Sequence, residues 1–172
     1  MNPRIRRVAV LAALASTAAV PALAADPIPD SRYGGQTSQR GALVFEFRVS
    51  ADGSRVERLF TQFRARRCEN AENGAQGSIR VASIALQDDG SFSKRGKETA
   101  RLKPSGSFEG GSQIERYRIT GRFPTPETAT GTLRVTVEVR NKAGETIDTC
   151  RMGRRTVTWS AERLGVVPET GE

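Results

Sequence analysis

The two cysteines, Cys68 and Cys150, are the most reactive side chains of this chain, and both stand next to arginines. The chain contains no histidine. This excludes nucleophiles activated by histidine and zinc or copper sites ligated by histidine. A cysteine pair behind an export signal indicates a disulfide rather than a metal site. We therefore predict that Cys68 and Cys150 are joined.

Six arginines adjoin the two cysteines in sequence. They are Arg64, Arg66, Arg67, Arg151, Arg154 and Arg155. A disulfide would gather them around one bridge, and a dense cluster of like charges favours an anionic partner. Guanidinium groups bind phosphate, sulfate or carboxylate through paired hydrogen bonds. The alternative is a solvated rim, because only four of the 27 basic residues are lysines, a bias typical of GC-rich genomes.

Paired carboxylates would be the remaining route to catalysis, since they hydrolyse glycosides without histidine. The candidates are Glu46, Glu57, Glu115 and Glu138. Each alternates with apolar neighbours in a predicted strand, so we predict that each points to solvent and pairs with arginines across strands. Asp88-Asp89-Gly90 is predicted to be a turn, because it lacks the spaced acids of a calcium loop. The sequence thus predicts no enzyme, no metal and no cofactor.

The start of the chain is typical of a secretory signal peptide. Three arginines precede an apolar run at residues 8–20, which is too short for a lasting membrane anchor. Ala22-Leu23-Ala24 then supplies the small residues of a cleavage site. We predict a signal peptide at residues 1–24, a flexible leader at 25–41, one domain at 42–164 and a disordered tail at 165–172. The mature chain would be exported to the periplasm or cell surface, with no membrane span.

The net charge supports a modestly basic mature protein. It is +8 for the whole chain at pH 7, and without the signal peptide 24 basic and 19 acidic residues remain, a net charge of +5. Any basic surface binds nucleic acid weakly through counterion release. An exported chain rarely meets nucleic acid, and the aromatic-basic strand motif of RNA-binding domains is absent. We expect no nucleic-acid partner.

The elements that must position these side chains are short strands. We predict strands at the segments 42–50, 55–66, 78–86, 113–123, 130–140, 145–150 and 154–163, and a short strand around Phe92. Apolar residues alternate with period two most clearly in the segments 42–50 and 130–140. A bulge near Arg58 would reconcile the two phases of the second segment. Residues 93–112 are predicted to be mobile, with a brief edge strand at residues 98–102 as the alternative. About eight strands between turn signals predict an all-β fold, a single antiparallel β-sandwich stapled by one disulfide, with a barrel as the alternative.

The only tryptophan, Trp159, lies in the last predicted strand. It shares its phase with Val157 and Ala161, which predicts burial in the core beside the disulfide. An exposed Trp159 would instead offer a platform for carbohydrate.

Three segments carry a resemblance: residues 117–123, residues 131–134, and residues 150–163 with their Cys…Trp-Ser-Ala-x-Arg pattern. They resemble uncharacterised secreted all-β proteins of GC-rich bacteria, over roughly residues 40–164. The resemblance implies the fold and carries no activity with it.

Together these features predict a secreted, non-catalytic binding or structural module. Its arginine patch would contact an anionic cell-envelope polymer or another exported, acidic protein. The alternatives are a glycan-binding module, which requires an exposed aromatic groove, and a carboxylate-based glycoside hydrolase, which requires two glutamates facing each other across a groove.

Overall fold

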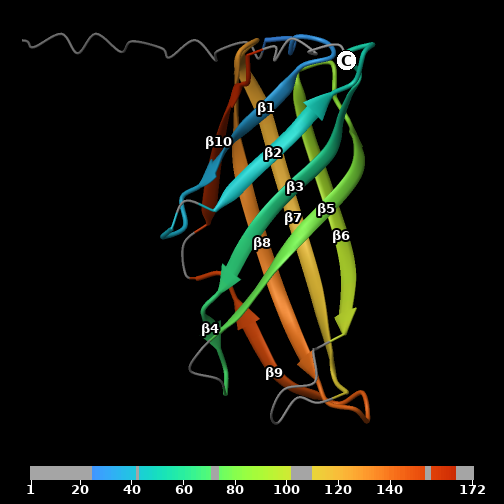
Figure 1. Ribbon diagram of the computed structural model, residues 1–172, viewed down its shortest axis with the longest axis vertical. Coiled ribbons are helices and arrows are strands. Elements are labelled where there is room, and N and C mark those ends of the chain that lie inside the picture. Colours follow the sequence, from blue (N-terminus) through green and yellow to red (C-terminus); the bar gives the residue numbers. More distant parts are fainter. Residues whose placement is uncertain (1–24, 42, 71–73, 102–109, 154–155, 166–172) are drawn as a thin grey trace, which may run out of the picture.

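The computed structural model describes residues 25–41, 43–70, 74–101, 110–153 and 156–165, which form ten strands and no helix (Figure 1). The predicted signal peptide and nearly all of the predicted tail lie outside these residues. Within them, no helix is long and apolar enough to cross a membrane. The all-β fold class is confirmed.

The ten strands belong to one antiparallel sheet. They are β1 (Arg32–Thr37), β2 (Val44–Val49), β3 (Arg55–Ala65), β4 (Arg67–Cys68), β5 (Ala75–Ala85), β6 (Ser91–Arg101), β7 (Ser112–Thr125), β8 (Thr128–Arg140), β9 (Thr146–Arg151) and β10 (Val157–Arg163). The hydrogen-bonded order is β4-β9-β8-β10-β1-β2-β3-β5, with β7 on the other edge of β8 and β6 beyond β7.

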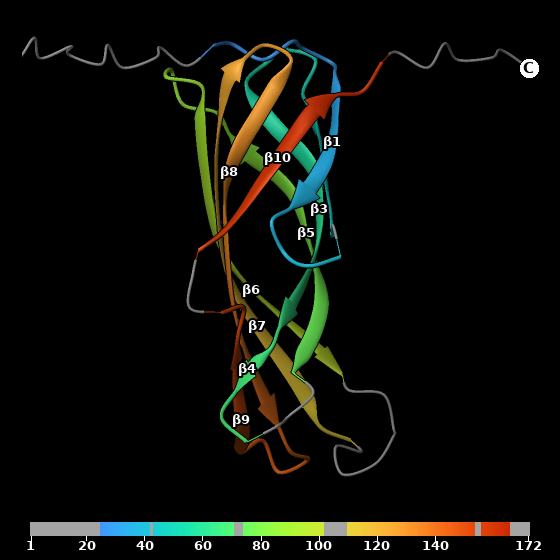
Figure 2. The ribbon, with the colours of Figure 1, turned by 90° about the vertical axis from the view of Figure 1, so that its left-hand side faces the viewer.

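The sheet curls on itself into a half-barrel, which is nearer to the predicted alternative, a barrel, than to a sandwich of two sheets (Figure 2). Strand β8 is long enough to pair with β10 along its first half and with β9 along its second half. Strands β5 and β6 follow each other through a short turn, yet they form no ladder along their described lengths. The curl therefore has an open seam between them. Strands β4 and β9 lie together at one end of the molecule.

The core lies inside this curl, where inward residues of β2 and β3 face those of β7, β8 and β10. Trp159 is 2% exposed, and its ring stacks on Phe45 at a centroid distance of 4.0 Å. The predicted burial of Trp159 is confirmed, but its predicted place beside the disulfide is wrong. Trp159 lies opposite Gly131 of β8, whereas Cys150 lies opposite Val137, six positions further along the same strand.

The bulge predicted near Arg58 is confirmed. The register between β2 and β3 shifts between Glu46 and Arg48, and Arg58 has a φ of 51°. The extra residue lets both Val56 and Leu59 point into the core.

Two segments predicted as flexible or mobile contain strands. The leader contains β1, where Tyr33 is fully buried and the ideal Cβ of Gly35 would lie 1.9 Å from the carbonyl oxygen of Ser160. Close approach of β10 thus demands a glycine, which erases the apolar alternation. Strand β6 continues to Arg101 through its pairing with β7. Only Phe92 is buried in this strand, because its other edge borders the open seam.

Candidate anion-binding surface

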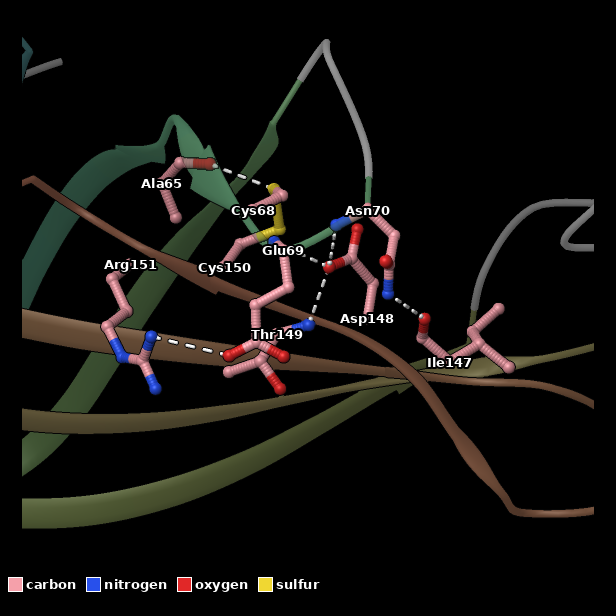
Figure 3. The surroundings of a disulfide bond; sticks show 9 residues. All are labelled: Ala65, Cys68, Glu69, Asn70, Ile147, Asp148, Thr149, Cys150 and Arg151. Atoms are coloured by element: carbon pink, nitrogen blue, oxygen red, sulfur yellow. Dashed lines mark hydrogen bonds and ion pairs between the residues drawn. A yellow bond between two sulfur atoms is a disulfide. The ribbon is translucent and has the colours of Figure 1, made fainter.

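Cys68 and Cys150 are joined, as predicted. They occupy directly paired positions on β4 and β9, with their Cα atoms 3.9 Å apart (Figure 3). The buried Asp148 lies close to both sulfur atoms. Because these sulfurs are bonded to each other, the three residues do not form a metal site.

Asp148 instead holds the chain that follows Cys68. Its Oδ1 accepts hydrogen bonds from the backbone N–H groups of Glu69 at 2.9 Å, Asn70 at 3.1 Å and Thr149 at 2.7 Å (Figure 3). The amide of Asn70 donates to the carbonyl oxygen of Ile147 at 3.1 Å. These contacts fix β4 against β9, and with it the arginines on both strands.

The disulfide brings two of the predicted arginines together, since Arg67 lies directly opposite Arg151. The nearest acid is Glu69, whose Oε1 lies 3.4 Å from Nη1 of Arg151, and both side chains are more than half exposed. An exposed pair of this kind contributes little net free energy. Arg154 and Arg155 lie outside the described residues.

Arg64 and Arg66 line a neighbouring groove of about 520 Å³ together with Arg40, Met152 and Thr156. The side-chain amide of Gln39 pairs with the backbone of Arg64, donating to its oxygen at 2.7 Å and accepting from its N–H at 3.1 Å. Nη1 of Arg64 donates to the carbonyl oxygen of Arg40 at 3.3 Å. The chain reversal after β1 thereby adds Arg40, which the sequence did not single out.

The arginines around the disulfide continue into two rows that cross the outer face of the sheet, here called the basic rows. The first row follows paired positions over five strands: Arg67, Arg151, Thr136, Arg116 and Lys97. The second row comprises Arg134, Arg118 and Arg95 on β8, β7 and β6. Adjacent strands lie about 4.8 Å apart, so the cations of each row are closely spaced, with Thr136 as the one interruption in the first row. All seven basic side chains are exposed.

Acidic side chains offset few of these cations. Glu138 lies 2.8 Å from Nε of Arg116 and 3.2 Å from Nη2 of Arg140, and its hydrogen bond with Arg116 lowers the pKa of Glu138. Within the described chain, the basic side chains of the second row make no ion pair. A line of uncompensated positive charge on one face attracts polyanions.

Sequence reasoning missed five members of the rows: Arg95, Lys97, Arg116, Arg118 and Arg134. The alternation of arginines in β7 was visible, but strand order and register were not. The three arginines of the second row become neighbours only through the pairing of β6 with β7 and of β7 with β8.

Of the candidate glutamates, Glu138 pairs with arginines as predicted, whereas the predicted exposure of Glu115 is wrong. Glu115 is 4% exposed, because it shares the inner side of β7 with Tyr117 and Ile119. Nε2 of Gln113 donates to Oε1 of Glu115 at 2.7 Å, and Oε2 has no partner. Burial raises the pKa of Glu115. This carboxyl is out of reach of a polymeric substrate.

An aromatic platform for sugars is absent from the described surface. Trp159 is in the core, and of the described aromatic side chains only Phe60 is partly exposed. The guanidinium carbon of Arg80 lies over the ring of Phe60, 4.8 Å from its centroid. Stacking of a sugar on an open ring is therefore not the mode of recognition that this surface offers.

Comparison with known proteins adds no assignment, since no protein-family model and no curated protein matches the chain. The resemblance to secreted all-β proteins of GC-rich bacteria stays a prediction.

Proposed function

We propose that this protein is an exported, non-catalytic module that binds an anionic polymer of the cell envelope through the basic rows. The main support for this proposal is that seven exposed basic side chains lie in two adjacent rows on one face of the sheet. A row that crosses five strands spans about 19 Å. This length fits a polymer with several charges better than a single small anion.

The electrostatic argument also favours a polymer. Among the described residues, no acid pairs with the second row, and Glu69 and Glu138 pair with only two cations of the first row, Arg151 and Arg116. Binding of a polyanion relieves the repulsion among the rows and releases its counterions. The groove beside Arg40, Arg64 and Arg66 extends the same positive surface. The disulfide supports export, because such bonds persist in oxidising compartments.

The test is salt-dependent binding to inorganic polyphosphate by two double variants of equal net charge. Arg118→Ser with Arg134→Ser removes two members of the second row. Arg32→Ser with Arg55→Ser removes two exposed arginines outside the rows. We expect the row variant to reduce the slope of log K against log salt concentration by about 1.4 to 1.8, from roughly 0.7 to 0.9 per phosphate contact in nucleic acids. The control should keep the slope of the wild type.

Equal slopes for the two double variants would show that net charge alone governs the binding of polyphosphate, and the proposal would then be wrong. Arg154→Ser with Arg155→Ser extends the test to the two predicted arginines outside the described residues. A reduced slope in that variant would show that Arg154 and Arg155 also contribute to polyanion binding.

A further inference from the structure

Two further rows of outward side chains adjoin the basic rows, and they carry mainly hydroxyl groups, with Arg122 as their one charged side chain. Thr158, Thr132, Thr120 and Ser93 form one row on β10, β8, β7 and β6. Gln36, Ser160, Thr130, Arg122 and Ser91 form the next row and reach β1. From the second basic row to the first hydroxyl row is a step of two residues along β7 and β8, about 7 Å.

These rows, apart from Ser93, line a groove of about 670 Å³. Its described lining holds the hydroxyl groups of six threonines and serines of β6, β7, β8 and β10, with Arg122 as its one cation and no carboxylate. The hydroxyl oxygens of Thr120 and Thr132 are hydrogen-bonded to each other at 2.7 Å. A hydroxyl has one donor and two acceptor positions, so this pair keeps one proton and several lone pairs for a ligand.

The floor of the groove is held by the core. Nε1 of Trp159 donates to the carbonyl oxygen of Thr120 at 3.1 Å. The indole fits beneath β7 and β8 because the paired residues Gly121 and Gly131 have no side chain, and the ideal Cβ of Gly131 would lie 2.5 Å from Cζ2 of Trp159. The hydroxyl groups above are thus fixed before any ligand arrives.

We infer that the polymer bound by this surface is an acidic polysaccharide, whose sugar hydroxyl groups occupy the groove while its acidic groups meet Arg122 and the basic rows. This inference rests on the proposed function and names its ligand class. A ligand that lies along the outer face of β7 contacts Arg116, Arg118, Thr120 and Arg122 in turn. That order suits a chain that carries both acidic groups and neutral hydroxyl groups.

Two other polyanions fit less well. A polyphosphate carries charge on each unit and has no hydroxyl groups to donate to the acceptor positions of the hydroxyl rows. An acidic peptide in extended form is recognised chiefly by pairing with a free strand edge. Strands β7, β8 and β10 are each paired on both sides where the groove lies, so their backbone groups are already engaged.

The inference is tested by calorimetric titration of the purified protein with polygalacturonate and with inorganic polyphosphate. Thr120→Val with Thr132→Val removes both partners of the hydroxyl pair and leaves no orphaned group. Thr158→Val removes an exposed hydroxyl and leaves that pair intact. Thr99→Val with Thr146→Val is the matched control, since both threonines are exposed and lie outside the groove.

We expect the Thr120, Thr132 double variant to weaken polygalacturonate binding about fivefold to tenfold, the effect of one or two lost neutral hydrogen bonds, and Thr158→Val to weaken it in the same direction. Polyphosphate binding should stay within twofold of the wild type, and the control variant should change neither affinity. Arg118→Ser with Arg134→Ser should weaken binding of both polymers.

Hydroxyl variants that leave polygalacturonate binding unchanged, or that weaken both polymers equally, would overturn the inference while the proposed function stands. A wild-type protein that binds neither polymer would overturn the proposed function itself.

Discussion

Glu115 and Glu98 lie directly opposite each other on β7 and β6, with both side chains on the inner side of the sheet. Glu115 is buried and Glu98 is partly exposed. Oε1 of Glu98 accepts a hydrogen bond from the backbone N–H of Arg80 at 3.4 Å, on the β5 edge of the seam. Burial first, and then the charge of Glu98, raise the pKa of Glu115, against a hydrogen bond from Gln113 that lowers it.

We predict that Glu115→Gln stabilises the protein at neutral and alkaline pH. A carboxyl whose pKa is raised by folding binds its proton more tightly in the folded state. Its contribution is therefore fully present below the unfolded pKa and is lost as the pH rises through the folded pKa. The gain of the variant should be on the order of 1 kcal/mol at pH 8, the scale of an unsatisfied buried polar group, and should vanish near pH 4.

Urea unfolding curves at several pH values between 4 and 8 measure this effect. The control is Glu138→Gln, whose parent carboxyl has a pKa lowered by Arg116. A lowered pKa contributes stability above the unfolded pKa that is lost as the pH falls, so this control should be destabilised at neutral pH. If the difference in free energy of unfolding between Glu115→Gln and the wild type is the same at every pH, folding does not raise the pKa of Glu115, and the prediction is wrong.

Removal of the disulfide should lower stability through the unfolded state. The bond joins residues 82 positions apart, and the chain-entropy treatment of such a loop gives about 4 to 5 kcal/mol at most. We expect Cys68→Ser with Cys150→Ser to show a lower melting temperature than the oxidised wild type. The reduced wild type should melt close to the variant, and equal melting of the oxidised wild type and the variant would contradict the prediction.

The fold could be predicted from the sequence wherever strands bury one face. Alternation in the segment that became β8 gave its inward residues, and the phase slip in β3 located the bulge at Arg58. Prediction was poor where another interaction replaced apolar burial. Strand β1 uses glycines because β10 approaches its backbone closely, and β6 buries little because it borders the seam.

The candidate surface could be predicted only in part, for a related reason. The cysteine pair implied that Arg67 and Arg151 meet, and they do. The remaining members of the basic rows depend on which strands pair and in which register, and local alternation does not encode either. Glu115 illustrates the same limit. Its charge alone predicts that it faces solvent, but it lies on the inner face of β7 and is buried.

Gly131→Ala should disrupt the aromatic core and the groove above it. The added Cβ would lie 1.9 Å from the carbonyl oxygen of Thr120 and 2.5 Å from Cζ2 of Trp159. Backbone cannot yield as a flexible side chain can, so we expect a loss of about 3 kcal/mol, at the upper end for an overpacked core. Trp159 is the only tryptophan, and its fluorescence should shift to longer wavelength as the indole is displaced. Gly165→Ala is the control, because none of the described residues beyond its chain neighbours lies within 4 Å of its ideal Cβ.

Arg58 should tolerate glycine and reject a β-branched residue. Its φ of 51° lies in the left-handed region, which costs a residue with a Cβ roughly 1 to 2 kcal/mol. We therefore expect Arg58→Gly to be at least as stable as the wild type. Arg58→Val should be less stable by about 1 to 2 kcal/mol, because branching at Cβ makes a positive φ a true outlier.

The matched control for the bulge is Arg55→Gly, in the same strand and equally exposed but without a positive φ. There glycine should destabilise by about 0.5 to 1 kcal/mol through the entropy of the unfolded chain. Thermal unfolding of the four proteins measures the order of stability. A valine at position 58 that matches the wild type would mean that β3 pairs without the bulge, and then Val56 and Leu59 could not both face the core.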